Sequence, residues 1–411
     1  MRFIKPAGVS GRIDAPPSKS MMQRAVIAAT LAHGQSIIAN PSFCDDALAA
    51  MEVARALGAE VERESARVRI RGGPGAKGGL LDCGESGTCM RMISAVAALQ
   101  DREFIISGKG SLLKRPVGMV EKPLRALGAE CSTNGGLPPL RVRGPIHGGR
   151  VEADGSESSQ FVSGLLMALP LCREDSEVSV RGLRSRDYLE MTLSLMRHFG
   201  VEVRAGSGME KFEVKGSQEY RPGGYEVEGD WSGAAFMLVA GAIAGEVEIR
   251  NLGRGKQPDQ AIGQVLCDAG AVVEYGGGAV RAGRGALKAF EYDAGGSPDL
   301  FPPLAALACS CEGRSVIFGA SRLRHKESDR AAVLAQELGK LGADIKIAGD
   351  RMEVTGRKLR GGRVNPRGDH RIAMAAAIAA LNSEKGVEIE DEGCVSKSYP
   401  GFFEDLERVM E

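Results

Sequence analysis

The 411 residues exceed what one ordinary hydrophobic core accommodates, so we expect two domains. Hydrophobic residues make up 43% and charged residues 26%, as in globular proteins generally, and the formal net charge is zero. This balance excludes attraction of the whole chain to nucleic acid or to an acidic membrane surface, so any anion site must be a local cluster of basic residues.

Nothing in the sequence indicates a membrane segment or a metal site. Residues 1–14 have strand character and lack the apolar stretch of a signal peptide, and the longest apolar runs fall short of the roughly 18 residues that span a bilayer. The nine cysteines form no CxxC pair and the five histidines are scattered. We therefore expect a cytoplasmic protein with reduced, mostly buried thiols and no metal.

One phrase recurs along the chain: a helical stretch that ends at a glycine, followed by two strands joined by a turn. The glycines follow one another at intervals of 70 to 72 residues, at Gly58, Gly128, Gly200, Gly270 and Gly342. A glycine directly after a helix and before an alternating pattern is typical of a helix C-terminus. Each phrase therefore predicts a helix followed by a β-hairpin.

A second phrase, out of phase with the first, is a polar, glycine-rich turn that leads into a helix of small apolar residues. It occurs six times at intervals of 67 to 73 residues, marked by Lys19, Thr88, Ser159, Ser232, Asp299 and His370. Small residues on all sides of a helix predict burial on most sides. So regular an interval indicates six structural repeats rather than ordinary α/β alternation.

The repeats predict how the chain divides into lobes. The sixth repeat lacks its hairpin, so we expect residues 1–14 to complete it. Lobe one would then comprise 1–14 and 227–411, and lobe two would comprise 15–226, with three repeats each. The glycine-rich stretch 72–79 lacks the Gly-Lys-Ser/Thr ending of a phosphate-binding loop and predicts only a connection between repeats.

Helix N-termini favour anions because their N–H groups are unsatisfied and the macrodipole is positive there. Five of the six helix starts carry polar or charged residues suited to a phosphorylated substrate, whereas Asp230-Trp231-Ser232 is predicted to be only a cap. Three loops add basic residues. The candidate residues are Lys19, Ser20 and Arg24; Gly87, Thr88 and Arg91; Ser158, Ser159 and Gln160; Asp299; Asp369, His370 and Arg371; and, in the loops, Lys114, Arg115, residues 325–330 and Lys397.

Taken together, these residues resemble the 5-enolpyruvylshikimate-3-phosphate synthase family. The resemblance runs in order along the whole chain, and Lys326-Glu327-Ser328-Asp329-Arg330 with Asp369-His370-Arg371 is its most specific part. It implies an α/β fold, an inside-out α/β barrel of two lobes with three βαβαββ units each, and an active-site cleft between the lobes.

The resemblance also implies the reaction. Shikimate 3-phosphate and phosphoenolpyruvate give enolpyruvylshikimate 3-phosphate and inorganic phosphate, with no metal and no organic cofactor, in a monomeric enzyme of aromatic amino-acid biosynthesis. Both substrates carry phosphate and carboxylate groups, so a dense basic site is needed to overcome their mutual repulsion.

By matched position, the resemblance implies a role for each candidate residue. Shikimate 3-phosphate would be bound by Lys19, Ser20, Arg24, Ser158, Ser159, Gln160, Ser185, Tyr188, Asp299, Arg322 and Lys326. Phosphoenolpyruvate would be bound by Lys19, Gly87, Thr88, Arg115, Gln160, Arg330, Arg371 and Lys397. Asp299 and Glu327, beside Lys19 and Lys326, would move the protons, and Glu85, Arg91, Asp369 and His370 would support the site.

Four positions depart from the pattern common in the family: Glu85 in place of asparagine, Met92 in place of proline, Asp187 within a Ser-Lys-Pro-Tyr stretch, and Arg322 in place of asparagine. These departures bear on fine substrate contacts rather than on the reaction. Gly87 keeps the small residue that leaves room for glyphosate, which is expected to compete with phosphoenolpyruvate.

Two alternatives stay open at the level of sequence. One is an enolpyruvyl transferase that acts on UDP-N-acetylglucosamine, although that family resembles Lys-Asn where this chain has Lys19-Ser20, and it uses a loop cysteine where Met119 follows Arg115 here. The other is a non-catalytic scaffold for phosphorylated ligands, which would not need Asp299 and Glu327 among the basic residues.

Overall fold

The computed structural model describes residues 1–73, 75, 78–253 and 255–411. The chain divides into two compact units: a continuous unit, Pro17–Val227, and a discontinuous unit, Met1–Pro16 with Glu228–Glu411. The connection expected at 72–79 includes positions 74, 76 and 77, which lie outside the described residues. Each unit has its own hydrophobic core.

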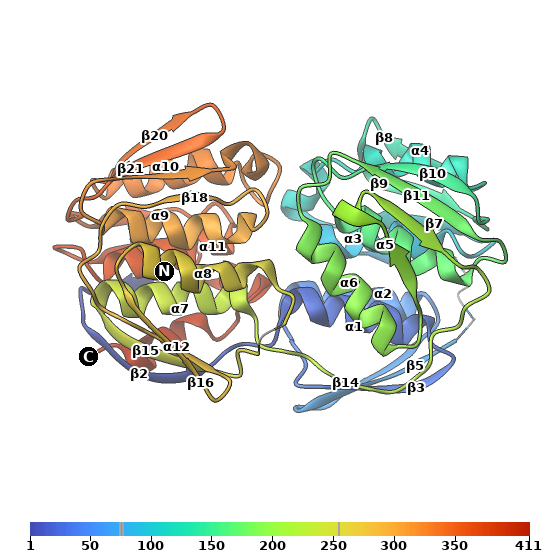
Figure 1. The fold of residues 1–411 in the computed structure, drawn as a ribbon, viewed down its shortest axis with the longest axis horizontal. Helices are drawn as coiled ribbons and strands as arrows, with labels where there is room; N and C mark the ends of the chain where they lie inside the picture. The colour runs from blue at the N-terminus through green and yellow to red at the C-terminus, as the bar shows by residue number, and fades with distance from the viewer. Residues whose placement is uncertain (74, 76–77, 254) are drawn as a thin grey trace. The chain divides into compact units, whose positions relative to one another are not determined.

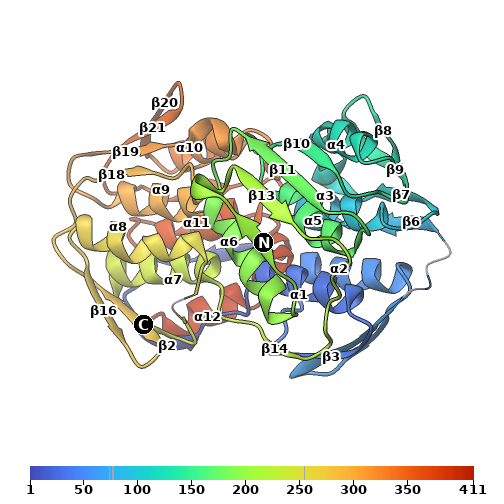
Figure 2. The ribbon, with the colours of Figure 1, turned by 45° about the vertical axis from the view of Figure 1, so that its right-hand side comes forward.

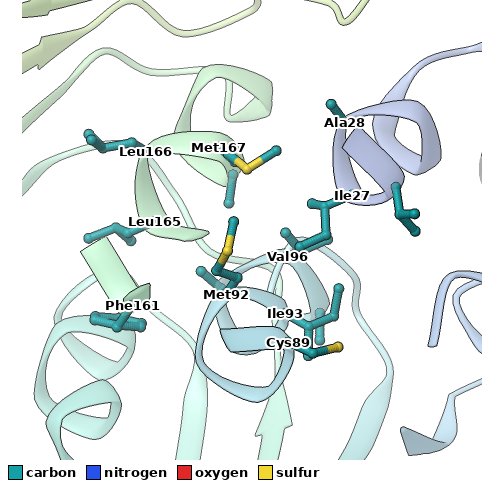
Figure 3. Close-up of a cluster of buried hydrophobic side chains, with 14 of the residues drawn as sticks. Ile27, Ala28, Cys89, Met92, Ile93, Val96, Phe161, Leu165, Leu166 and Met167 are labelled. Carbon is teal, nitrogen blue, oxygen red and sulfur yellow. The ribbon is translucent and has the colours of Figure 1, made fainter. Parts of the chain in front are cut away.

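In the continuous unit, three helices form the centre of the core. They are α1 (Lys19–Leu31), α3 (Gly87–Ala97) and α5 (Gln160–Ala168), and each begins at the predicted polar turn. Figure 3 shows their side chains meeting, with Ile27 of α1, Met92 of α3 and Leu165 of α5 among them. The burial expected of such small-residue helices is confirmed.

The discontinuous unit repeats this arrangement with α7 (Trp231–Ala244), α9 (Phe301–Cys309) and α11 (His370–Ala380), which lie beside one another in Figure 1. A short 3-10 turn, η6 (Pro298–Leu300), leads into α9. Every residue of α9 and α11 is buried, so these helices have no solvent-facing side.

The second helix of each repeat lies outside this centre and ends as predicted. These helices are α2 (Asp45–Ala56), α4 (Glu121–Ala126), α6 (Arg186–His198), α8 (Ile262–Asp268), α10 (Arg330–Lys340) and α12 (Phe402–Val409). The five predicted glycines follow the first five of them with φ between 82° and 100°. Glycine adopts this left-handed conformation without strain, which explains why it marks each helix end.

Six small sheets surround the buried helices, three in each unit. In the continuous unit the strand orders are β14 (Gly224–Glu226), β3 (Gly34–Ala39), β5 (Arg67–Gly72), β4 (Glu60–Arg63); β6 (Gly79–Asp82), β7 (Glu103–Ser107), β9 (Leu137–Arg143), β8 (Glu130–Asn134); and β10 (Arg150–Asp154), β11 (Ser176–Arg181), β13 (Lys211–Val214), β12 (Val203–Ala205).

In the discontinuous unit they are β2 (Val9–Asp14), β15 (Gly245–Arg250), β17 (Ala279–Gly283), β16 (Val272–Gly276); β18 (Glu291–Asp293), β19 (Arg314–Phe318), β21 (Arg351–Thr355), β20 (Asp344–Ala348); and β22 (Gly362–Val364), β23 (Val387–Ile389), β1 (Arg2–Ile4). In each sheet the first two strands are parallel, and the remaining strands pair antiparallel.

Alternate residues of the strands face solvent, as the alternating exposed and buried positions of β9 show. Helices inside and half-exposed sheets outside are the inside-out α/β arrangement that the sequence predicts.

The N-terminal segment is shared between two sheets, which corrects one expectation. Strand β1 completes the sixth sheet by pairing antiparallel with β23, as predicted. Strand β2 does not: it pairs in parallel with β15, in the fourth sheet. The strand that precedes α7, β14, likewise pairs with β3 of the first sheet (Figure 2). At each crossing, the chain therefore leaves its last strand in the unit from which it departs.

Seven of the nine cysteines are buried, whereas Cys394 is intermediate and Cys267 is exposed at the end of α8. Among the described residues, no helix combines the length and apolar character that crossing a membrane requires.

The contact between α3 and α5 gives a stability prediction. A Cβ atom added at Gly164 would lie 2.3 Å from the backbone oxygen of Met92, so Gly164→Ala forces two buried helices apart. We expect a loss of about 1–3 kcal/mol in the free energy of unfolding, the usual cost of overpacking a core. The matched control is Gly339→Ala in α10, where an added Cβ meets nothing within 4 Å and alanine favours the helix. Urea denaturation that gave both variants the same midpoint would contradict this account.

Candidate active site

The predicted site residues form two groups, one in each unit. In the continuous unit, the first group begins at α1, whose N-cap Ser18 accepts a hydrogen bond from the backbone N–H of Met21. Lys19 follows in the first turn, and its Nζ lies 3.1 Å from Oδ2 of Asp46, with both side chains mostly buried. Asp46, in the first turn of α2, is a site residue that sequence reasoning missed. Two acidic residues at the start of that helix were the available signal, but they read as an ordinary helix terminus.

Arg24 is the most deeply buried cation of this group. Its guanidinium donates to Thr192 Oγ1 at 2.9 Å and to the backbone oxygens of Ser20 and Tyr188. Burial lowers the pKa of Arg24 to about 10, and the opposing contributions come from Tyr188 and Tyr225 rather than from carboxylates. A buried cation whose protein partners are neutral groups is suited to an anionic ligand.

Gln160, the first residue of α5, connects two helix starts. Its Oε1 accepts a 2.7 Å hydrogen bond from Arg91, and its Nε2 donates a 2.7 Å hydrogen bond to Thr88 Oγ1. Arg91 also donates to the backbone oxygen of Pro116, in the loop that carries Arg115. The starts of α3 and α5 and this loop are therefore held in one network.

Arg115 lies directly over Gly87. A Cβ atom at Gly87 would be 2.7 Å from Arg115 Cζ, so only glycine leaves this guanidinium in place. Glu85, in the same turn, accepts a 2.9 Å hydrogen bond from Ser111 in the 3-10 turn η1 (Gly110–Lys114) that precedes Arg115. The departure at Glu85 thus attaches the turn before α3 to the segment that carries the arginine.

The remaining predicted residues of this unit surround Arg24 and Gln160. Ser159 and Ser185 are buried, Ser158 Oγ accepts a hydrogen bond from the backbone N–H of Gln160, and Tyr188 is half-buried. Of the two other departures, Met92 packs in the three-helix core and Asp187 is exposed on α6. Neither points to a change in chemistry.

In the discontinuous unit, the second group centres on Arg330, which is 1% exposed and lies at the start of α10. Its guanidinium meets three carboxylates: Glu327 at 2.6 Å, Asp369 at 3.0 Å and Asp299 at 3.3 Å. Burial lowers the pKa of Arg330, but these carboxylates outweigh burial and raise it above its usual value. The arginine therefore stays charged at any ordinary pH.

Asp299 connects Arg330 to a second arginine. Its Oδ2 lies 2.8 Å from Arg371 Nη2, while its Oδ1 faces Arg330, so a single carboxylate bridges two buried cations. Asp299 itself is only partly buried, and Glu327 keeps a side-chain exposure of 8%. Both predicted acid/base residues are thus anchored by Arg330.

Asp369 holds this arrangement in place. It caps α11, accepting from the backbone N–H of Arg371 at 3.0 Å, and it also accepts from Ser328 Oγ and Arg330 Nε. His370, next along the helix, is fully buried. The supporting role expected of Asp369 matches these contacts.

Three further predicted cations lie in this unit. Lys397, in the 3-10 turn η8 (Glu392–Lys397), is buried, whereas Lys326 and Arg322 are half-buried. Arg322, in the 3-10 turn η7 (Ala320–Leu323), donates to the backbone oxygen of Gly295. In the described part of the chain, no three histidine, cysteine, aspartate or glutamate side chains gather closely enough to hold a metal ion.

The two groups differ in chemistry. The continuous unit offers hydroxyls, an amide and buried cations suited to a polar ring and its phosphate. The discontinuous unit offers paired arginines with two carboxylates, which can bind an anion and move protons beside it.

Comparisons with known proteins agree with this division of chemistry. The family model for EPSP synthase (3-phosphoshikimate 1-carboxyvinyltransferase) matches residues 4–406. Two proteins named 3-phosphoshikimate 1-carboxyvinyltransferase are similar along their full length. The one from Thermococcus kodakarensis is 43% identical over 100% of both chains, and the one from Methanocorpusculum labreanum is 38% identical over 99% of this chain and 98% of its own.

A solved structure, EPSP synthase from Acinetobacter baumannii, superposes with a TM-score of 0.83 at 28% identity, covering 99% of this chain and 97% of its own. With the family model and the full-length relatives, this similarity shows that the chain belongs to the EPSP synthase family, the 3-phosphoshikimate 1-carboxyvinyltransferases.

Proposed function

We propose that the two groups of residues act on one pair of substrates, shikimate 3-phosphate and phosphoenolpyruvate. As a member of its family, the chain transfers the enolpyruvyl group of phosphoenolpyruvate to the 5-hydroxyl of shikimate 3-phosphate and releases phosphate, a step of the shikimate pathway. The observation that carries the residue assignment is the bridge from Asp299 to both Arg330 and Arg371.

We assign shikimate 3-phosphate mainly to the continuous unit. Arg24 supplies a buried positive charge whose present partners are neutral, and Ser20, Ser158, Ser159 and Ser185 surround it with hydroxyls. Gln160 presents its amide between Arg91 and Thr88, beside the expected position of the sugar ring. Tyr188 completes this set, and Lys19, Asp299, Arg322 and Lys326 are the further contacts.

Phosphoenolpyruvate is assigned to the arginines. Arg330 and Arg371 are buried and held by carboxylates, so they present charge without a large cost in side-chain entropy. Arg115, over Gly87 and near Thr88, provides a third guanidinium in the continuous unit. Lys397 and Lys19 add charge, and Gln160 adds an amide.

The reaction is an addition followed by an elimination. The 5-hydroxyl oxygen attacks the carbon that bears the enol phosphate, while the methylene gains a proton and becomes a methyl group. The resulting tetrahedral intermediate then loses a methyl proton and its phosphate. We assign the hydroxyl proton to Asp299, with Lys19 and Lys326 nearby, and both methyl proton transfers to Glu327, first as acid and then as base.

This assignment gives the chain a simple requirement. We propose that it works as a monomer in the cytoplasm without a metal or organic cofactor, since side chains of the sequence supply every proton transfer.

Phosphate release tests the acceptor. Incubation with phosphoenolpyruvate and shikimate 3-phosphate is expected to release phosphate in a ratio of one to one with enolpyruvyl product. UDP-N-acetylglucosamine in place of shikimate 3-phosphate, and no acceptor at all, are the two controls and should give none. Absence of release with shikimate 3-phosphate would rule out the proposed function.

Substitution tests the proton transfers. Glu327→Gln and Asp299→Asn keep the shape of each side chain but remove its basicity, so kcat is expected to fall by about 10²–10⁴. Asp268→Asn, an exposed carboxylate on α8, serves as the matched control and should leave kcat unchanged. Thermal unfolding of each variant separates chemistry from folding, and near-full turnover by either site variant would refute its assigned role.

Glyphosate tests the contact between Gly87 and Arg115. Inhibition is expected to be competitive with phosphoenolpyruvate. Gly87→Ala places a methyl group against the guanidinium, so the inhibition constant should rise by about tenfold or more, equivalent to about 1.4 kcal/mol. Initial-rate kinetics at several phosphoenolpyruvate concentrations measure both effects. Unaltered turnover of the unsubstituted enzyme in millimolar glyphosate would contradict the prediction.

A further inference from the structure

The fourth helix start has a contact that its capping role does not require. Asp230 caps α7 as predicted, accepting from the backbone N–H of Gly233 at 2.9 Å. Ser232, in the first turn, donates a 2.5 Å hydrogen bond to Oδ2 of Asp259. Asp259 lies in the 3-10 turn η5 (Pro258–Ala261) and is 1% exposed. A carboxyl group is therefore buried beside a helix start that otherwise carries no chemistry.

Asp259 lies close enough to the catalytic group to interact with it electrostatically. Its charged neighbours are Asp299 before α9, Arg371 at the start of α11, and Asp230 at the cap of α7. Of these, only Arg371 is a cation, and Asp299 already holds that cation at 2.8 Å. Two carboxylates thus compete for one guanidinium.

The other elements around η5 add no strong charge. Helix α8, which also packs against η5, carries Cys267 and Asp268, and both are exposed at its far end. Lys256, just before η5, is exposed. Glu228 is linked to the same segment through Gln257, whose Nε2 donates to it at 2.7 Å.

These surroundings disfavour the ionised form of Asp259. Burial is the largest cause and repulsion by Asp299 the next, whereas the hydrogen bond from Ser232 and the charge of Arg371 oppose them. The net effect raises the pKa of Asp259 to about 7. Asp259 therefore carries a proton below neutral pH and loses it above.

We propose that Asp259 is a positioning residue that keeps a proton beside the Asp299–Arg371 ion pair and thereby sets the pH range in which Arg371 binds phosphoenolpyruvate. The inference rests on the proposed function, which assigns that substrate to Arg371. Once deprotonated, Asp259 attracts Arg371 and repels Asp299, so less of the positive charge of the guanidinium is available to the anionic substrate. Affinity for phosphoenolpyruvate should consequently fall as pH rises through neutrality.

The first test compares the full-length enzyme with Asp259→Asn between pH 6 and pH 8.5. Asparagine has the shape of the protonated acid and keeps an oxygen that can accept from Ser232, but it cannot ionise. In the unsubstituted enzyme, KM for phosphoenolpyruvate should rise relative to the variant by about tenfold, since a one-unit pKa change on binding equals a tenfold change in affinity. Ionisation of the substrate itself is common to both and cancels in the ratio, and kcat should change much less than KM.

A second variant fixes the sign. Ser232→Ala removes the hydrogen bond that favours the carboxylate, so the rise in KM should move to higher pH. Asp268→Asn is the matched control and should leave the profile unchanged. Trp231, the sole tryptophan, lies between Asp230 and Ser232, and its fluorescence should titrate near pH 7 in the substrate-free enzyme but not in Asp259→Asn.

The outcomes separate cleanly. A KM ratio that stays constant with pH, or a fluorescence titration that persists in Asp259→Asn, would overturn the inference while leaving the proposed function intact. If Asp259→Asn fails to fold, an unshifted profile in Ser232→Ala overturns it instead. A lower melting temperature with an unchanged pH profile would mean that Asp259 is only structural. Absence of any transfer by the unsubstituted enzyme would count against the proposed function itself.

Discussion

Each unit can bury three helices side by side only because their contact faces carry glycine and other small residues. Gly164 brings α5 against the backbone of α3, and Gly241 leaves α7 so close to the next strand that an added Cβ would lie 2.3 Å from the Ala282 oxygen. This close approach also brings the helix starts together. Ser86, the cap of α3, donates to Gln23 of α1, and Gln160 of α5 reaches Thr88 of α3. The site thus depends on packing that contains none of its functional residues.

The charges of the site are arranged by burial rather than by number. The formal net charge of the chain is zero, yet Arg24, Arg330 and Arg371 are all buried. Arg330 and Arg371 are held by carboxylates, two of which are the proposed proton carriers, so the same ion pairs that make burial tolerable also orient the acid and the base. Arg24 has neutral partners instead. This difference distinguishes a cation kept for a ligand from cations that also position catalytic groups.

Local patterns predicted most of the fold and much of the site, whereas contacts between distant segments were beyond them. The regular spacing of Gly58 and its equivalents indicated six repeats, because a glycine in the left-handed conformation is a local requirement of each helix end. The pairing of β2 with β15 could not be predicted in this way, since any strand can join either of two similar sheets. Asp46 and Asp259 were missed for the same reason: each acts on a residue of another element, Lys19 and Asp299, at a distance in sequence that no short motif records.

The exchange of strands at the two crossings also bears on how the protein forms during synthesis. Nearly all of the continuous unit leaves the ribosome as one stretch, so its three helices can assemble early. Strands β1 and β2 emerge before it, but their partners β23 and β15 are made only later. The first segment of the discontinuous unit must therefore wait with unpaired backbone groups and the exposed apolar side chain of Phe3 until those strands follow. The unit synthesised first and last is thus the one most dependent on protection against premature association.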